Sequence, residues 1–142
     1  MSHVNELTQV MVVRGVDLNS VADVTGGVWG PVAFPVMIRG IFAVITNAIA
    51  AAGVVKADKR PTAGDDTGRG DGDLGVLTFS TAHTLGKVVY HLLTDPVKLS
   101  PGEELVFQCT DATGASDTCT LGILMYPSWE TPANIASMIA TA

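Results

Sequence analysis

Residues 86–110 have the sequence GKVVYHLLTDPVKLSPGEELVFQCT, in which two apolar runs lie on either side of a Pro-Gly pair. Proline suits the second position of a β-turn, so Pro101-Gly102 predicts a turn between two strands. Residues 86–93 are predicted as a long strand that is buried on both faces except at His91. Residues 104–110 are predicted as a further strand, and the two strands together indicate an antiparallel β domain.

The rest of the chain repeats this pattern of short apolar runs separated by turn residues. Further strands are predicted at residues 10–16, 36–46, 76–80 and 118–126. Residues 50–56 are small and apolar and are predicted as a strand, with a helix over 47–52 as the alternative. Residues 25–31, rich in glycine, are predicted as a loop. About seven or eight strands at this spacing predict an all-β fold, a jelly-roll-like antiparallel β-sandwich.

The length of 142 residues fits one domain, because two independent cores would each be small and marginal. We expect an N-terminal arm at residues 1–9, the β-sandwich domain at residues 10–126, and a C-terminal arm or short helix at residues 127–142.

A short C-terminal helix is predicted because Thr131 can cap it and Pro132 suits its first position. Ile135, Met138 and Ile139 then share one face. A helix this short is marginal alone, so its apolar face is expected to dock on the body of the chain or on a neighbouring subunit.

The low fraction of charged residues and the negative net charge indicate which kinds of partner the chain can bind. Charged residues make up 15% of the chain, against about 25% in typical domains, which favours a protein whose surface is covered in an assembly. The net charge of −6 argues against binding to nucleic acid, which requires clustered lysine and arginine, and against an anionic membrane surface.

Residues 34–55 form an apolar stretch long enough to span a bilayer, although Arg39 and Asn47 interrupt it. Because much of it is β-branched, two buried strands and a turn are the preferred interpretation. Residues 1–10 have neither a basic segment nor an apolar one, so we expect no signal peptide.

Two cysteines, Cys109 and Cys119, flank the segment 110–118. If that segment is a hairpin loop centred on Gly114, the two side chains oppose each other across the strands and a disulfide is feasible. Two neighbouring free thiols are the equal alternative, and the redox compartment decides between them.

Catalytic and cofactor motifs are not apparent. His3, His83 and His91 do not have the spacing of zinc ligands, and no nucleophile elbow, phosphate-binding loop or dinucleotide fingerprint occurs. We therefore expect neither an enzyme nor a bound cofactor or metal. Residues 62–73, rich in Asp and Gly, are predicted as an exposed loop; calcium binding and an Arg69-Gly70-Asp71 adhesion tripeptide are the functional alternatives.

Trp29 and Trp129 lie in turn-rich segments just outside the predicted strands. Each tryptophan is expected either to fold back over the sandwich or to anchor an interface, where tryptophan is enriched. With Ile135, Met138 and Ile139, they are the candidate interface residues.

Several of these segments together resemble the small head-decoration (cement) proteins of tailed bacteriophages. The segments are 75–80 (GVLTFS), 86–90 (GKVVY), 97–107 (VKLSPGEELVF), 110–114 (TDATG) and 121–125 (LGILM). The resemblance covers residues 34–126 and consists of strands and turns rather than of chemical groups.

The resemblance implies a homotrimeric structural virion protein that is made in the host cytoplasm, binds the outside of the capsid and bridges major capsid subunits. A carbohydrate- or receptor-binding module of a virion, with loop 62–73 at its tip, and a tail or connector component are the alternatives.

Overall fold

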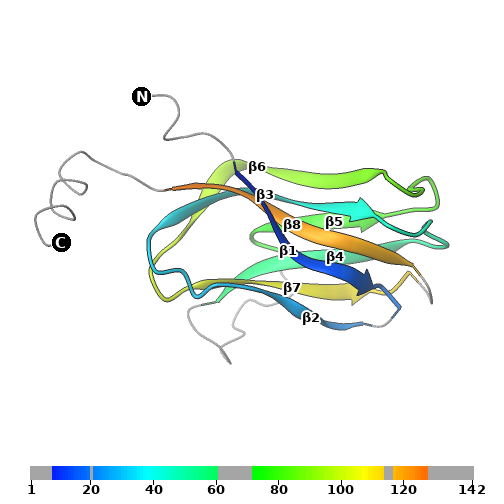
Figure 1. Ribbon diagram of the computed structural model, residues 1–142, viewed down its shortest axis with the longest axis horizontal. Helices are drawn as coiled ribbons and strands as arrows, with labels where there is room; N and C mark the ends of the chain where they lie inside the picture. The colour runs from blue at the N-terminus through cyan, green and yellow to red at the C-terminus, as the bar shows by residue number, and fades with distance from the viewer. Residues whose placement is uncertain (1–7, 20, 61–71, 114–116, 128–142) are drawn as a thin grey trace, which may run out of the picture.

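The computed structural model describes residues 8–19, 21–60, 72–113 and 117–127. Within these ranges the chain forms eight β-strands (Figure 1). They are β1 (Thr8–Asp17), β2 (Ala22–Trp29), β3 (Val36–Ile45), β4 (Gly53–Arg60), β5 (Gly75–Phe79), β6 (Val88–Leu99), β7 (Glu104–Asp111) and β8 (Thr118–Pro127).

The strands form two four-stranded antiparallel sheets. Sheet 1 has the order β1-β8-β3-β6, and sheet 2 has the order β2-β7-β4-β5. The pairs β1–β8, β2–β7, β3–β6 and β4–β5 are those of a long hairpin rolled into a barrel-like sandwich. This arrangement is a jelly roll, so the predicted all-β sandwich is confirmed.

The core lies between the two sheets, because alternate residues of each strand point inward. Fully buried side chains come from both layers: Ile38, Ile41, Ile45, Leu121 and Ile123 from sheet 1, and Leu77, Phe79, Leu105 and Phe107 from sheet 2. Burial of one such large side chain stabilises the fold by about 1.5–3 kcal/mol.

The turn between β6 and β7 is confirmed at Pro101-Gly102. The backbone N–H of Glu103 donates to the carbonyl oxygen of Ser100 at 2.9 Å, which closes the turn. Gly102 has a φ of +92°, a conformation that favours glycine at the third position of such a turn.

The prediction of a loop at residues 25–31 is wrong for residues 25–29, because β2 runs through to Trp29, and it is confirmed for Gly30 and Pro31, which follow the strand. Its pairing with β7 shifts register between Asp23 and Val28, where Gly26 adopts a φ of +74°. The glycines therefore belong to an irregularity within a strand rather than to a connection between strands.

The alternative of a helix over residues 47–52 is also wrong. The backbone N–H of Ala50 donates to the Asp117 carboxylate at 3.0 Å, and that of Ile49 donates to the carbonyl of His83 at 3.0 Å. These donors are used by distant partners and not by a helical turn.

The apolar stretch at residues 34–55 contains β3 and the start of β4, as predicted. In the described ranges no helix has the length and apolar character needed to cross a membrane.

The strands extend slightly beyond the expected domain limits of 10–126, from Thr8 to Pro127, so Thr8 and Gln9 belong to β1 and not to an arm. The predicted C-terminal helix, with Trp129, Ile135, Met138 and Ile139, lies outside the described residues.

Candidate interaction surface

One part of the outward side of sheet 1 brings together uncharged side chains from all four of its strands, whereas Lys98 lies farther along β6 on the same side. We call these side chains the uncharged face. They are Gln9 and Met11 of β1, Thr120 and Leu124 of β8, Phe42 and Val44 of β3, and Val88, Tyr90 and Leu92 of β6. None of the nine carries a charge, and most are apolar.

The strand register sets the arrangement of this face. Phe42 pairs with Tyr90 on one side and with Gly122 on the other. A Cβ atom built on Gly122 would lie 2.4 Å from the ring of Phe42, so the ring lies directly over this glycine. Phe42 is thereby buried although it points away from the core.

The β6 side chains of the uncharged face are strongly exposed. The exposed fractions are 64% for Tyr90, 53% for Val88 and 47% for Leu92. The prediction that residues 86–93 are buried on both faces is therefore wrong. β6 is an edge strand of sheet 1, and only its inward residues, such as Val89, join the core.

The outward side of sheet 2 has a different chemistry. Its side chains include Val28, Lys56, Asp58, Arg60, Val76, Thr78, Glu104, Val106 and Gln108. Arg60 and Glu104 are paired across β4 and β7 and form an ion pair, in which the Glu104 side chain is only 2% exposed. Two of the charged side chains of this face, Arg60 and Glu104, therefore have each other as partners within the same chain.

Asp58 holds the segment that leads into β5. Its Oδ1 atom accepts hydrogen bonds from the backbone N–H of Gly72 at 2.7 Å and from that of Asp73 at 3.4 Å. Burial raises the pKa of Asp73, a hydrogen bond from the backbone of Lys59 lowers it, and the adjacent carboxylate of Asp58 raises it further. Asp58 and Asp73 therefore form an acidic pair at the base of the predicted loop 62–73, of which residues 62–71 lie outside the described ranges.

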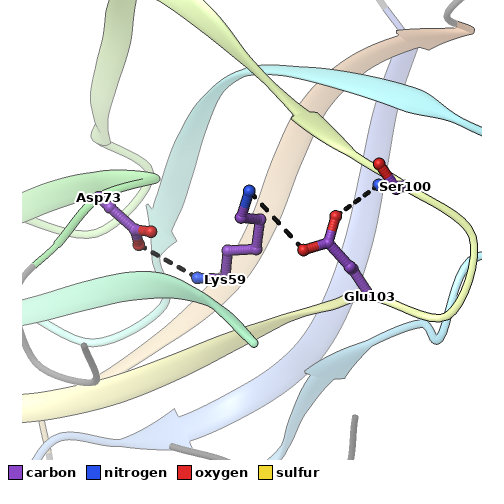
Figure 2. A network of polar contacts seen from close by, with 4 residues as sticks. All are labelled: Lys59, Asp73, Ser100 and Glu103. Atoms are coloured by element: carbon purple, nitrogen blue, oxygen red, sulfur yellow. Dashed lines mark hydrogen bonds and ion pairs between the residues drawn. The ribbon is translucent and has the colours of Figure 1, made fainter. Parts of the chain in front are cut away.

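Lys59 connects this region to the β6–β7 turn, as Figure 2 shows. Its backbone N–H donates to Asp73 Oδ1 at 3.1 Å, and its Nζ atom lies 3.7 Å from Glu103 Oε2. The other oxygen of Glu103 accepts from the backbone N–H of Ser100 at 2.7 Å. This polar network joins three segments that are distant in sequence.

Two hollows lie away from the uncharged face. A polar one of about 370 Å³ lies between β1 and β2 and is lined in part by Arg14, Asp17, Asn19 and Thr25. An apolar one of about 310 Å³ is lined by Trp29, Pro31, Phe34 and Met125, among others. Trp29 packs against the core and borders this second hollow beside the exposed Phe34.

Both cysteines are buried free thiols. Of the two alternatives, free thiols and a disulfide across a hairpin, the first is observed, and there is no such hairpin because β7 and β8 lie in different sheets. Each thiol points into the core from its own sheet. Burial, with a smaller contribution from the nearby Cys109, raises the pKa of Cys119 to about 12; burial also raises the pKa of Cys109. Both groups are therefore protonated and unreactive at neutral pH.

The two described histidines have structural hydrogen bonds. Nδ1 of His83 accepts from the backbone N–H of Ser80 at 2.9 Å, and Nδ1 of His91 lies 3.1–3.2 Å from the backbone of Val76. Over the described part of the chain, no group of three or more His, Cys, Asp or Glu side chains is placed to hold a metal ion.

One stretch of the sequence indicates the uncharged face, but its apolar character was interpreted as burial within the chain. Residues 88–93 (VVYHLL) are largely apolar except at His91, which fits a strand buried on both faces within one chain. It equally fits an edge strand whose outer side is covered by other protein. The low charge content of the chain favours the second interpretation.

The fold and this surface define the chain as a jelly-roll domain with one uncharged outer face, which is typical of a protein–protein contact. No protein-family model matches the chain, and neither does any curated protein. Among solved structures, that of tomato aspermy virus ("The Structure of Tomato Aspermy Virus by X-Ray Crystallography") is similar over 90% of this chain and 81% of that chain, with 11% identity and a TM-score of 0.44. The fold assignment rests on the strand order and pairing described above.

Proposed function

We propose that this chain is a non-enzymatic structural protein that works by contact with other proteins in a virion. The observation that carries the proposal is the uncharged face, an apolar surface that spans all four strands of sheet 1. Contiguous exposed apolar surface is uncommon on proteins that act alone and marks sites of protein contact.

The particular role that we propose is decoration of a bacteriophage capsid. The chain binds the outside of the assembled shell as a homotrimer and bridges major capsid subunits. The strand and turn pattern shared with head-decoration proteins supports this role, and jelly rolls recur among viral capsid domains. The fold contributes by analogy, because one fold serves many functions.

The mechanism is mass action. A protein that binds the assembled shell and not its separated subunits stabilises the shell by its free energy of binding. A trimer attaches at several points, so each later contact forms at a high effective concentration. Neither catalysis, nucleic acid, a membrane nor a cofactor has a part in this mechanism.

A second candidate is a carbohydrate- or receptor-binding module of a virion. The polar hollow between β1 and β2 favours it, because Arg14, Asp17, Asn19 and Thr25 provide donors and acceptors suited to sugar hydroxyls. A tail or connector role is compatible with the same fold but has no separate observation in its favour.

The test is binding to capsids of the phage that encodes the chain, prepared without the chain itself. We expect the purified protein to cosediment with these capsids and to raise the temperature at which they release their DNA. Absence of the chain from native particles, together with no cosedimentation, contradicts the proposal. Binding to a glycan array that is lost in an Asp17→Ala, Asn19→Ala variant establishes the second candidate instead.

A further inference from the structure

We infer that the uncharged face is the contact between copies of this chain. The copies turn this side of sheet 1 toward one another, and the capsid is bound through other surfaces. The inference rests on the proposed function, because it names the partner of the surface that carries that function.

The composition of the face distinguishes a second copy from a capsid protein. Permanent interfaces between identical subunits are strongly apolar and resemble a protein core cut in half. Interfaces between partners that fold separately and meet later are about as polar as the rest of the surface. Exposed Met11, Val88, Tyr90 and Leu92, with no charge among the nine residues, match the first kind.

The distribution of charge points to the same partner. Each copy has a net charge of −6, so two copies repel each other over most of their surfaces. The uncharged face avoids both this repulsion and the cost of removing charged groups from water. A contact through the outward side of sheet 2 would remove the charge of Lys56 from water, whereas Asp58, Arg60 and Glu104 already have partners within the chain.

The size of the face indicates which part of the contact it forms. Its residues span at most five positions along a strand, as from Val88 to Leu92 of β6. With a rise of about 3.3 Å per residue and about 4.8 Å between strands, this part of four strands measures roughly 300 Å² in projection. A standard stable interface buries about 800 Å² per partner and has an apolar centre with a polar rim, so the uncharged face forms the centre of the contact and not all of it.

The experiment compares two valine-to-lysine variants of the full chain. Val88→Lys places a charge within the uncharged face. Val28→Lys is the matched control, because Val28 is 40% exposed on an outward strand position of sheet 2, against 53% for Val88. The mass of each purified protein at micromolar concentration is measured by light scattering, and circular dichroism verifies that each variant is folded.

We expect an oligomer for the unmodified chain and for Val28→Lys, and a 14.7 kDa monomer for Val88→Lys. If Val88 contributes as an interface hot spot, its replacement raises the dissociation constant by about 30-fold or more. Tyr90→Lys is a second variant with the same expected result, should Val88→Lys fail to fold.

The outcomes separate the inference from the proposed function. A monomeric unmodified chain that still binds capsids overturns the inference and leaves the decoration role standing. An oligomer that persists in folded Val88→Lys and Tyr90→Lys also overturns it, since the interface then lies elsewhere. A dimer that Val88→Lys dissociates supports the inference and contradicts the trimer.

Discussion

The uncharged face of sheet 1 and the outward side of sheet 2 differ in the charged groups that they contain. On sheet 2, Arg60 is paired with Glu104, and the Asp58 carboxylate accepts a hydrogen bond from the backbone of Gly72. On sheet 1, the apolar Met11, Val88 and Leu92 of the uncharged face are exposed, as is Tyr90. The ion pair on sheet 2 is formed within one chain, whereas the uncharged face of sheet 1 is suited to contact with a partner.

The chemistry of a surface without a catalytic group can therefore still indicate its function. Burial alone does not distinguish the two sides, because both contain nearly buried residues that point outward, such as Phe42 and Glu104. The two residues differ in their partners, because the Glu104 carboxylate pairs with Arg60 whereas the Phe42 ring packs over Gly122. The following predictions alter one side or the other, beginning with the largest expected effect.

Replacing Arg60 by methionine removes the partner of the buried Glu104 carboxylate. Removal of one member of a buried ion pair costs about 3–5 kcal/mol, because an uncompensated charge remains. Urea unfolding at neutral pH measures this loss. The double variant Arg60→Leu, Glu104→Leu makes this side of sheet 2 resemble sheet 1, and we expect it to recover most of the stability. A loss below about 1 kcal/mol in the single variant would show that the pair is effectively solvated.

Gly122→Ala disturbs sheet 1 from its outward side. The new Cβ would lie 2.4 Å from the Phe42 ring and 2.6 Å from the backbone oxygen of Val10, and the second of these is not free to move aside. Overpacking of this kind costs about 1–3 kcal/mol. Adding Phe42→Leu relieves only the contact with the ring, so we expect partial recovery of the melting temperature. Full stability in Gly122→Ala alone would mean that β1 can shift relative to β8.

Lys59→Met removes a more exposed ion pair, whose Nζ–Oε2 distance to Glu103 is 3.7 Å. Exposed pairs contribute about 0–1 kcal/mol, so we expect a much smaller loss of unfolding free energy than for Arg60→Met. High salt should abolish the difference between Lys59→Met and the unmodified chain, and should leave most of the Arg60→Met effect. Equal losses for the two variants would remove the distinction between buried and exposed charges on this side.

Asp73→Asn tests the acidic pair beside sheet 2. The pKa of Asp73 is raised above its ordinary 3.8, chiefly by burial, so the folded protein binds this proton more tightly than the unfolded chain does. The contribution of this proton to stability is complete below pH 3.8 and is lost as the pH rises through the raised pKa. We expect Asp73→Asn to reduce the fall in stability over that range, measured by urea unfolding from about pH 3 to about pH 7. An unchanged pH profile would count against the raised pKa.

Much of the fold follows from the sequence because period-two alternation and turn chemistry are local signals. The strands at 36–46 and 76–80 and the turn at Pro101-Gly102 were predicted for this reason. β2 was missed because Gly26 and Gly27 are signals of a loop, and only the pairing with β7 shows that they lie within a strand.

The uncharged face could not be predicted, because it depends on which strands are neighbours. A run such as VVYHLL does not state whether its outward residues meet the same chain or another. Similarly, the nine residues between Cys109 and Cys119 fit a hairpin, and they fit equally well a connection from one sheet to the other, which is what the structure contains. The placement of Trp129, Ile135, Met138 and Ile139 stays a prediction.

The two thiols in the core can be used to measure how often the folded molecule opens. Cys109 lies on sheet 2 and Cys119 on sheet 1, and both are almost inaccessible to reagents in the folded state. A thiol reagent reacts with them only when the layers separate or the chain unfolds, so the labelling rate reports the frequency of opening. A partner that covers the uncharged face is expected to slow this labelling, although neither sulfur lies on that face. The labelling rate of the two buried sulfur atoms thus reports how strongly a partner on the outer surface stabilises the sandwich against opening.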